Sequence, residues 1–249
     1  MKKYLILAVA AMMCMACNQQ NDPDVPNNKI TEAVSTKATT LLGQKEAVVD
    51  QQLLAAGFVK VDYKDFKLPG RNHVKSDAEK TIEKEYLYGF EYGDNEEQTL
   101  QSYYAALKKG TMVVEAYAKY SLEGKLLSMS TVFALPVYAK TNGLHADICD
   151  RIYNSLPSNA ERMDWEASIL HGEDETIYKS HAEYIAAVRA EGPCNAGEGA
   201  ECHMPEGKPS YAYSCMMHHP TPAEAQEGLQ EEGVVYGTVT VFVGNPAKW

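Results

Sequence analysis

MVVEAYAKYSLEGKLLSMSTVFAL, residues 112–135, holds two runs rich in β-branched and aromatic side chains around a short polar break. Glu123-Gly124 falls in that break, and glycine readily takes the backbone conformations that tight turns need. The pattern predicts a β-hairpin with strands over residues 112–120 and 126–135. The second strand is expected to place one apolar row on a single face: Leu127, Met129, Phe133 and Leu135.

Helices are predicted on both sides of this hairpin, because apolar residues recur there at helical spacing. Gly43 is expected to interrupt the first of them. Asp174 is expected to cap the last, since its carboxylate can accept from the free N–H groups at a helix start. The predicted helices cover residues 30–56, 94–110, 142–156 and 175–190.

Further strands are predicted where polar and apolar side chains alternate. Residues 85–92 place four aromatic side chains on one face, with Glu85 and Glu91 on the other, solvent-facing side. Residues 234–243, VVYGTVTVFV, are almost all β-branched or aromatic, which indicates a strand inside a sheet, covered on both faces. The other predicted strands cover residues 58–63 and 163–169.

The order of these elements predicts an α+β fold for residues 30–249. The hairpin favours an antiparallel sheet, and the amphipathic helices are expected to pack on one face of it. Groups of helix and strand occur in both halves of the chain. This arrangement allows two related lobes, about residues 30–137 and 138–249, although no residue-level repeat links them.

The first residues have the pattern of a targeting segment. Lys2 and Lys3 precede an apolar run over residues 4–13, too short to span a bilayer, and small residues follow before Cys17. This pattern resembles the signal peptide and lipobox of bacterial lipoproteins. The resemblance implies removal of residues 1–16 and acylation of Cys17, with palmitate among the acyl groups. Residues 17–29 are polar and contain proline, which predicts a flexible tether.

The same resemblance implies a protein of the cell envelope. Asn18 follows Cys17, which resembles the sorting pattern of outer-membrane lipoproteins, so the lipid on Cys17 is expected to hold the domain on the outer membrane. An oxidising compartment favours disulfides over free thiols. Four cysteines of the folded part are therefore candidates for two bridges, with three possible pairings: Cys149, Cys194, Cys202 and Cys215.

Residues 192–233 carry the candidate chemistry. This segment is rich in Gly, Pro and Glu and is interpreted as a long polar loop. One interpretation of its cysteines is a loop closed by disulfides, in which Cys194 pairs with Cys202 or either of them pairs with Cys215. The alternative is a copper or zinc site, because thiolate, thioether and imidazole groups suit these ions. The candidate ligands are Cys202, His203, Cys215, His218 and His219.

Net charge and motifs limit the possible functions of this protein only broadly. The net charge of −11 disfavours binding to nucleic acid. No nucleophile with a recognisable base is apparent, so catalysis is not expected and a hydrolase ranks third. The sequence therefore predicts a non-catalytic binding or structural module of the cell envelope, without a cofactor, for an unidentified protein or small-molecule ligand. A zinc- or copper-binding lipoprotein is the alternative.

Overall fold

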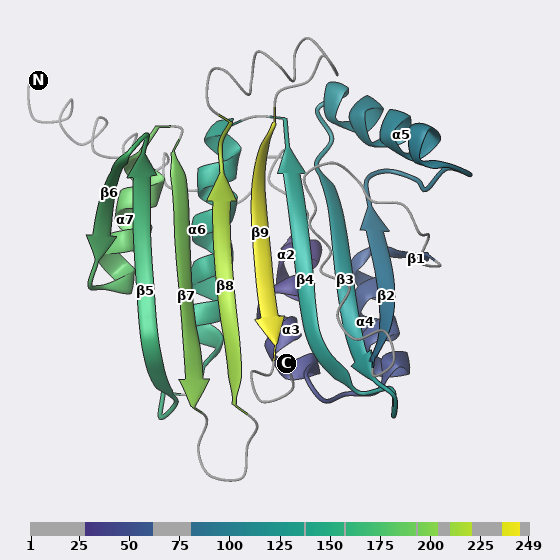
Figure 1. Ribbon diagram of the computed structural model, residues 1–249, viewed down its shortest axis with the longest axis horizontal. Coiled ribbons are helices and arrows are strands. Elements are labelled where there is room, and N and C mark those ends of the chain that lie inside the picture. Colours follow the sequence, from purple (N-terminus) through teal and green to yellow (C-terminus); the bar gives the residue numbers. More distant parts are fainter. Residues whose placement is uncertain are drawn as a thin grey trace, which may run out of the picture.

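The computed structural model describes residues 28–61, 81–136, 138–156, 158–192, 194–203, 210–220 and 236–244. The predicted signal peptide, Cys17 and the tether up to residue 27 lie outside these residues. The described strands form one nine-stranded antiparallel sheet in the order β1-β2-β3-β4-β9-β8-β7-β5-β6 (Figure 1). Their bounds are β1 Val59–Val61, β2 Thr81–Tyr88, β3 Val113–Ser121, β4 Leu126–Leu135, β5 Glu161–His171, β6 Asp174–Tyr178, β7 Asn195–His203, β8 Tyr211–His218 and β9 Gly237–Gly244.

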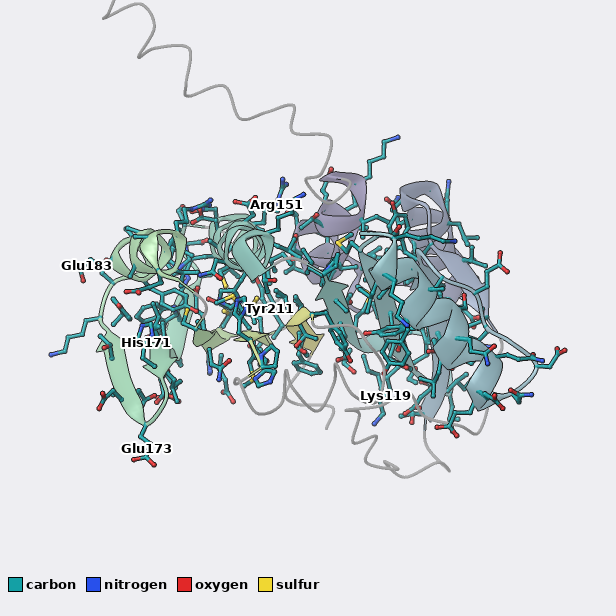
Figure 2. All side chains as sticks on the ribbon, turned by 90° about the horizontal axis from the view of Figure 1, so that it is seen from above. Lys119, Arg151, His171, Glu173, Glu183 and Tyr211 are labelled. Atoms are coloured by element: carbon teal, nitrogen blue, oxygen red, sulfur yellow. The ribbon has the colours of Figure 1, made fainter. Side chains whose placement is uncertain are left out.

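Most of the helices cover one face of this sheet, as the view along its upper edge shows (Figure 2). The half with β1 to β4 is covered by α2 (Asn28–Val34), α3 (Thr36–Leu41) and α4 (Glu46–Ala56). The other half is covered by α6 (Tyr138–Ser155) and α7 (His181–Ala190). The main hydrophobic core lies between this helical layer and the sheet and runs through both halves. The α+β class predicted from the sequence is confirmed.

Helix α5 (Glu96–Lys108) packs on the opposite face of the sheet. Its apolar side contacts Val113 and Ala134, whose neighbours Val114 and Phe133 point into the main core. Because successive side chains of a strand alternate between faces, α5 covers the other side, at one end of β3 and β4. Asn95 caps this helix by accepting from the backbone N–H of Gln98 at 3.0 Å.

The predicted hairpin and the predicted inner strand are both present. β3 and β4 pair across a turn in which Gly124 takes a φ of +72°. β9 lies between β4 and β8 and joins the two halves of the sheet. Leu126 rather than Leu127 faces the core, because an irregularity at Lys119/Tyr120 shifts the pairing by one residue.

Three local predictions are wrong. The helix predicted from Asp174 begins only at His181, and Asp174–Tyr178 instead turns back at Gly172 to pair with β5. Glu85 is fully buried rather than solvent-facing. The predicted loop over residues 192–233 contains two inner strands, β7 and β8, whose buried positions alternate strictly. The buried positions of β7 are small residues and a glutamate, and glycines lie between them. The sequence therefore shows no alternation of apolar and polar residues there.

The described helices include none that combines the length and the apolar character needed to cross a bilayer.

Replacing Val239 tests the junction between the two halves of the sheet. Val239 is fully buried and pairs with Phe133 of β4 and Met217 of β8. We expect Val239→Ala to lower the free energy of unfolding in urea by about 2 kcal/mol, because two methyl groups leave the core and a cavity remains. Thr240→Val, on the opposite face, is the control and is expected to change it by less than about 0.5 kcal/mol. Equal losses in the two variants would contradict the assignment.

Candidate metal centre

The five metal ligands predicted from the sequence do not converge. Cys202 and His203 lie at the end of β7, where Cys202 pairs with Tyr211 at the start of β8. His218 ends β8, and His219 follows it at the other end of the same strand pair. Tyr211 and His218, the two ends of β8, are seven positions apart, which corresponds to about 20 Å or more. A single ion cannot contact both groups.

The four cysteines are free and buried in the structure. Cys194 directly precedes β7 and Cys202 lies near its end, so an extended strand of about 20 Å or more separates their Cα atoms. A disulfide needs Cα atoms about 4.4–6.8 Å apart. The structure therefore does not bring together Cys194 and Cys202, one of the pairings considered above.

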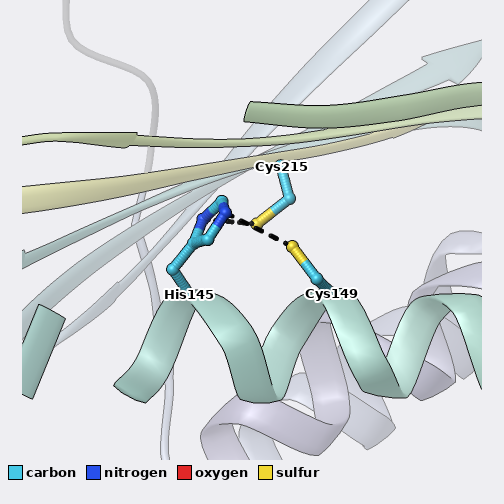
Figure 3. A group of neighbouring side chains, drawn as sticks. All are labelled: His145, Cys149 and Cys215. Atoms are coloured by element: carbon cyan, nitrogen blue, oxygen red, sulfur yellow. Dashed lines mark hydrogen bonds between the residues drawn. The ribbon is translucent and has the colours of Figure 1, made fainter. Parts of the chain in front are cut away.

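A different set of side chains does converge, between α6 and the sheet (Figure 3). His145 and Cys149 are four residues apart on α6 and share the face that packs on the sheet. Cys215 reaches the same point from β8. One donor atom from each lies within 4.8 Å of the others, and all three residues are fully buried.

His145 is at the centre of this group. Its Nδ1 lies 3.3 Å from the Sγ of Cys215, and its Nε2 lies 3.5 Å from the Sγ of Cys149. The hydroxyl of Tyr184, on α7, lies 2.6 Å from the same Nε2. An outer hydrogen bond of this kind fixes the orientation of a histidine ring whose other nitrogen binds a ligand.

The two thiols of the group differ in acidity. Burial and the neighbouring Cys215 raise the pKa of Cys149 well above its ordinary value. Burial also disfavours a thiolate at Cys215, but the hydrogen bond from Cys149 and the hydrogen bond and charge of His145 outweigh it and lower the pKa of Cys215 to about 6. A negative charge on Cys215 is therefore favoured by its neighbours Cys149 and His145.

A second polar network continues from this group toward the surface. The carboxylate of Glu198, on β7, accepts hydrogen bonds from Trp165 Nε1 at 3.0 Å and Tyr213 Oη at 2.9 Å. His181, at the start of α7, places Nδ1 2.9 Å from Glu198 and Nε2 2.9 Å from Asp150. Only an imidazolium can donate from both nitrogens, so the network contains a charged histidine between two carboxylates.

The pKa values of this network favour its charged form. Burial would lower the pKa of His181, but hydrogen bonds and charges of Glu198 and Asp150 outweigh it and raise that pKa. Burial would raise the pKa of Glu198, but its bonds from His181, Trp165 and Tyr213 outweigh it and lower that pKa. The Glu198 carboxylate is therefore ionised in the interior.

The surface end of this network opens into a pocket of about 990 Å³. The ring of Tyr153 stacks on His181 with centroids 3.8 Å apart and planes 2° from parallel. The guanidinium of Arg162 lies 3.8 Å from the same ring centroid, which places it on the other side of the ring. Other residues of the wall include Asp150, Trp165 and Arg189. The pocket gives solvent a route to His181, one side chain away from Glu198.

Sequence reasoning missed His145 and treated Cys149 only as a disulfide candidate. A signal was available, since His145 and Cys149 share one face of a strongly predicted helix. Their partner Cys215 could not be assigned to them, because it lies 66 residues beyond Cys149 on a strand interpreted as loop. Neither His181 nor Glu198 is among the candidate site residues predicted from the sequence.

Comparisons with protein-family models, with curated proteins and with solved structures found no match.

His219 provides a pH test of the local structure. It is buried, and its Nε2 lies 2.9 Å from the amide oxygen of Asn142, so the neutral ring donates there. Burial and the neighbouring His218 lower the pKa of His219 to about 4. The unfolded chain, with a histidine pKa of about 6.5, then binds more protons between pH 6.5 and 4, so stability falls as the pH falls through this range.

We expect His219→Gln, which keeps an N–H donor, to remove about 2–3 kcal/mol of the stability lost between pH 6.5 and 4. Urea unfolding at several pH values measures the difference between the variant and the natural protein. An unchanged pH dependence in the variant would show that His219 is not held neutral in the fold.

Proposed function

We propose that this protein is a cell-envelope lipoprotein whose folded domain binds a soft metal ion. The observation that carries the proposal is the convergence of His145, Cys149 and Cys215 at one fully buried point. Two thiolates and one imidazole are the donor set that zinc(II) and copper(I) prefer. A buried thiolate also needs a partner for its charge, and a bound cation supplies one.

The proposed site is built on rigid elements. Two donors come from a single helix and one from an inner strand, so the fold fixes their separation before an ion arrives. Tyr184 contacts the His145 ring from outside the group, which supports one ring orientation. The function proposed is binding, storage or delivery of the ion, and the anchor on Cys17 keeps this function at the outer membrane.

Metal binding is tested on the full chain, reduced, stripped of metal and then titrated with zinc(II) or copper(I) under anaerobic conditions. We expect one equivalent to bind to the natural protein and Cys215→Ser to lose at least about tenfold in affinity, because one of three donors is removed. Cys202→Ser is the matched control, since Cys202 is also fully buried but lies near the far end of β7. It is expected to bind normally.

Two results would overturn the proposal. One is the absence of stoichiometric binding by the reduced natural protein. The other is binding that Cys202→Ser and Cys215→Ser weaken equally. A Cys149–Cys215 disulfide in protein isolated from the envelope, with no metal bound after its reduction, would assign the two thiols a structural role instead.

The membrane anchor has its own test. We expect cells given labelled palmitate to incorporate it into the natural protein and to retain that protein in the outer-membrane fraction. Cys17→Ser is expected to lose the label and the membrane retention, because the acylated thiol is gone. Cys14→Ser, in the same segment, is the control and should keep both. Full labelling of the Cys17→Ser protein would exclude this cysteine as the acylated residue.

A further inference from the structure

Glu198 lies on β7, the strand next to the one that carries Cys215. It is the direct cross-strand partner of Cys215, so the two side chains share the face of the sheet that α6 covers. Cross-strand partners have Cβ atoms about 4.5–5.5 Å apart. The negative charge of Glu198 and a hydrogen bond between its carboxylate and the Cys149 thiol are also among the causes that raise the pKa of Cys149, after burial and Cys215. Glu198 is thus near both thiols.

The two oxygens of this carboxylate have different surroundings. Oε1 receives all three hydrogen bonds, from Trp165, His181 and Tyr213. Oε2 is buried and receives no N–H or O–H donor in the part of the chain that the structure describes. A buried carboxylate oxygen without a partner is unfavourable, and native proteins usually satisfy it with a donor, a water molecule or a cation.

We infer that Glu198 Oε2 is the fourth ligand of the site formed by His145, Cys149 and Cys215, and that this makes the site selective for zinc(II). The inference rests on the metal-binding function proposed above. The inference requires a shift of the Glu198 carboxylate toward the thiols, because Glu198 is not among the three donors that already converge.

The choice of ion follows from the donor set. Zinc(II) takes four ligands in a tetrahedron and accepts carboxylate oxygen together with sulfur and nitrogen. Copper(I) prefers soft thiolate and thioether donors, so a carboxylate adds little to its binding. The three groups on Oε1 are positioning residues, because they hold the carboxylate while its other oxygen stays available.

The test compares zinc(II) and copper(I) affinities of the full, reduced chain by competition with chelators. We expect Glu198→Gln to weaken zinc binding at least about tenfold and to change copper(I) binding less than about threefold, because the amide has no negative charge for the divalent ion. Glu201→Gln is the matched control, since Glu201 is exposed on the same strand. It should leave both affinities unchanged.

A second measurement does not depend on a variant that folds. X-ray absorption by the zinc-loaded natural protein is expected to report two sulfur and two nitrogen or oxygen ligands, and a single nitrogen or oxygen ligand would contradict the role of Glu198. Unchanged zinc affinity in Glu198→Gln, with loss of binding in Cys215→Ser, would overturn the role of Glu198 and leave the metal site standing. Failure of the natural protein to bind either ion would overturn the metal site itself.

Discussion

Polar side chains buried under α6 and α7 depend on hydrogen-bond partners within the protein, because burial removes most of their contact with water. This requirement explains the hydrogen bonds around Glu198 in the C-terminal half of the structure. A single carboxylate oxygen of Glu198 accepts from Trp165, His181 and Tyr213, and His181 connects it to Asp150. Without these donors, an ionised carboxylate at this depth would strongly destabilise the fold. The other oxygen of Glu198 is buried and receives no N–H or O–H donor from the described residues.

The sheet makes this polar interior possible. β9 is hydrogen-bonded to β4 on one side and β8 on the other, so one continuous sheet supports the helices of both halves. Tyr86, Tyr120 and Phe133 lie in a largely apolar core on the β1–β4 side. The other side buries His145, Glu198 and two thiols beneath α6. In each half, helix precedes two strands and a further helix precedes the remaining strands, but the division into two lobes remains a prediction.

Local patterns in the sequence were sufficient for the fold class and for most elements. The hairpin over residues 112–135 and the β-branched run of β9 have strong period-two patterns, and α6 has a regular apolar stripe. β7 escaped notice because its buried positions are Ala196, Glu198, Ala200 and Cys202, which do not read as a hydrophobic face.

The site was harder to predict than the fold, since its members are distant in sequence. His145 and Cys149 could be paired from helical spacing alone, but nothing in their segment points to Cys215 or Glu198. Clusters such as Cys202-His203 and His218-His219 attracted the metal interpretation, although a strand pair holds them apart. Ligand-type residues that are close together in the sequence therefore did not identify the side chains that converge. The pairing of β7 with β8 and the helical spacing in α6 determine which ones do.

The most direct measurement is a crystal structure of the zinc-loaded protein with anomalous scattering recorded on both sides of the zinc edge. The account predicts one strong peak between α6 and β8, within about 2.0–2.3 Å of donor atoms from His145, Cys149 and Cys215. A peak elsewhere on the protein, or a Cys149–Cys215 disulfide with no peak beside it, would contradict the account.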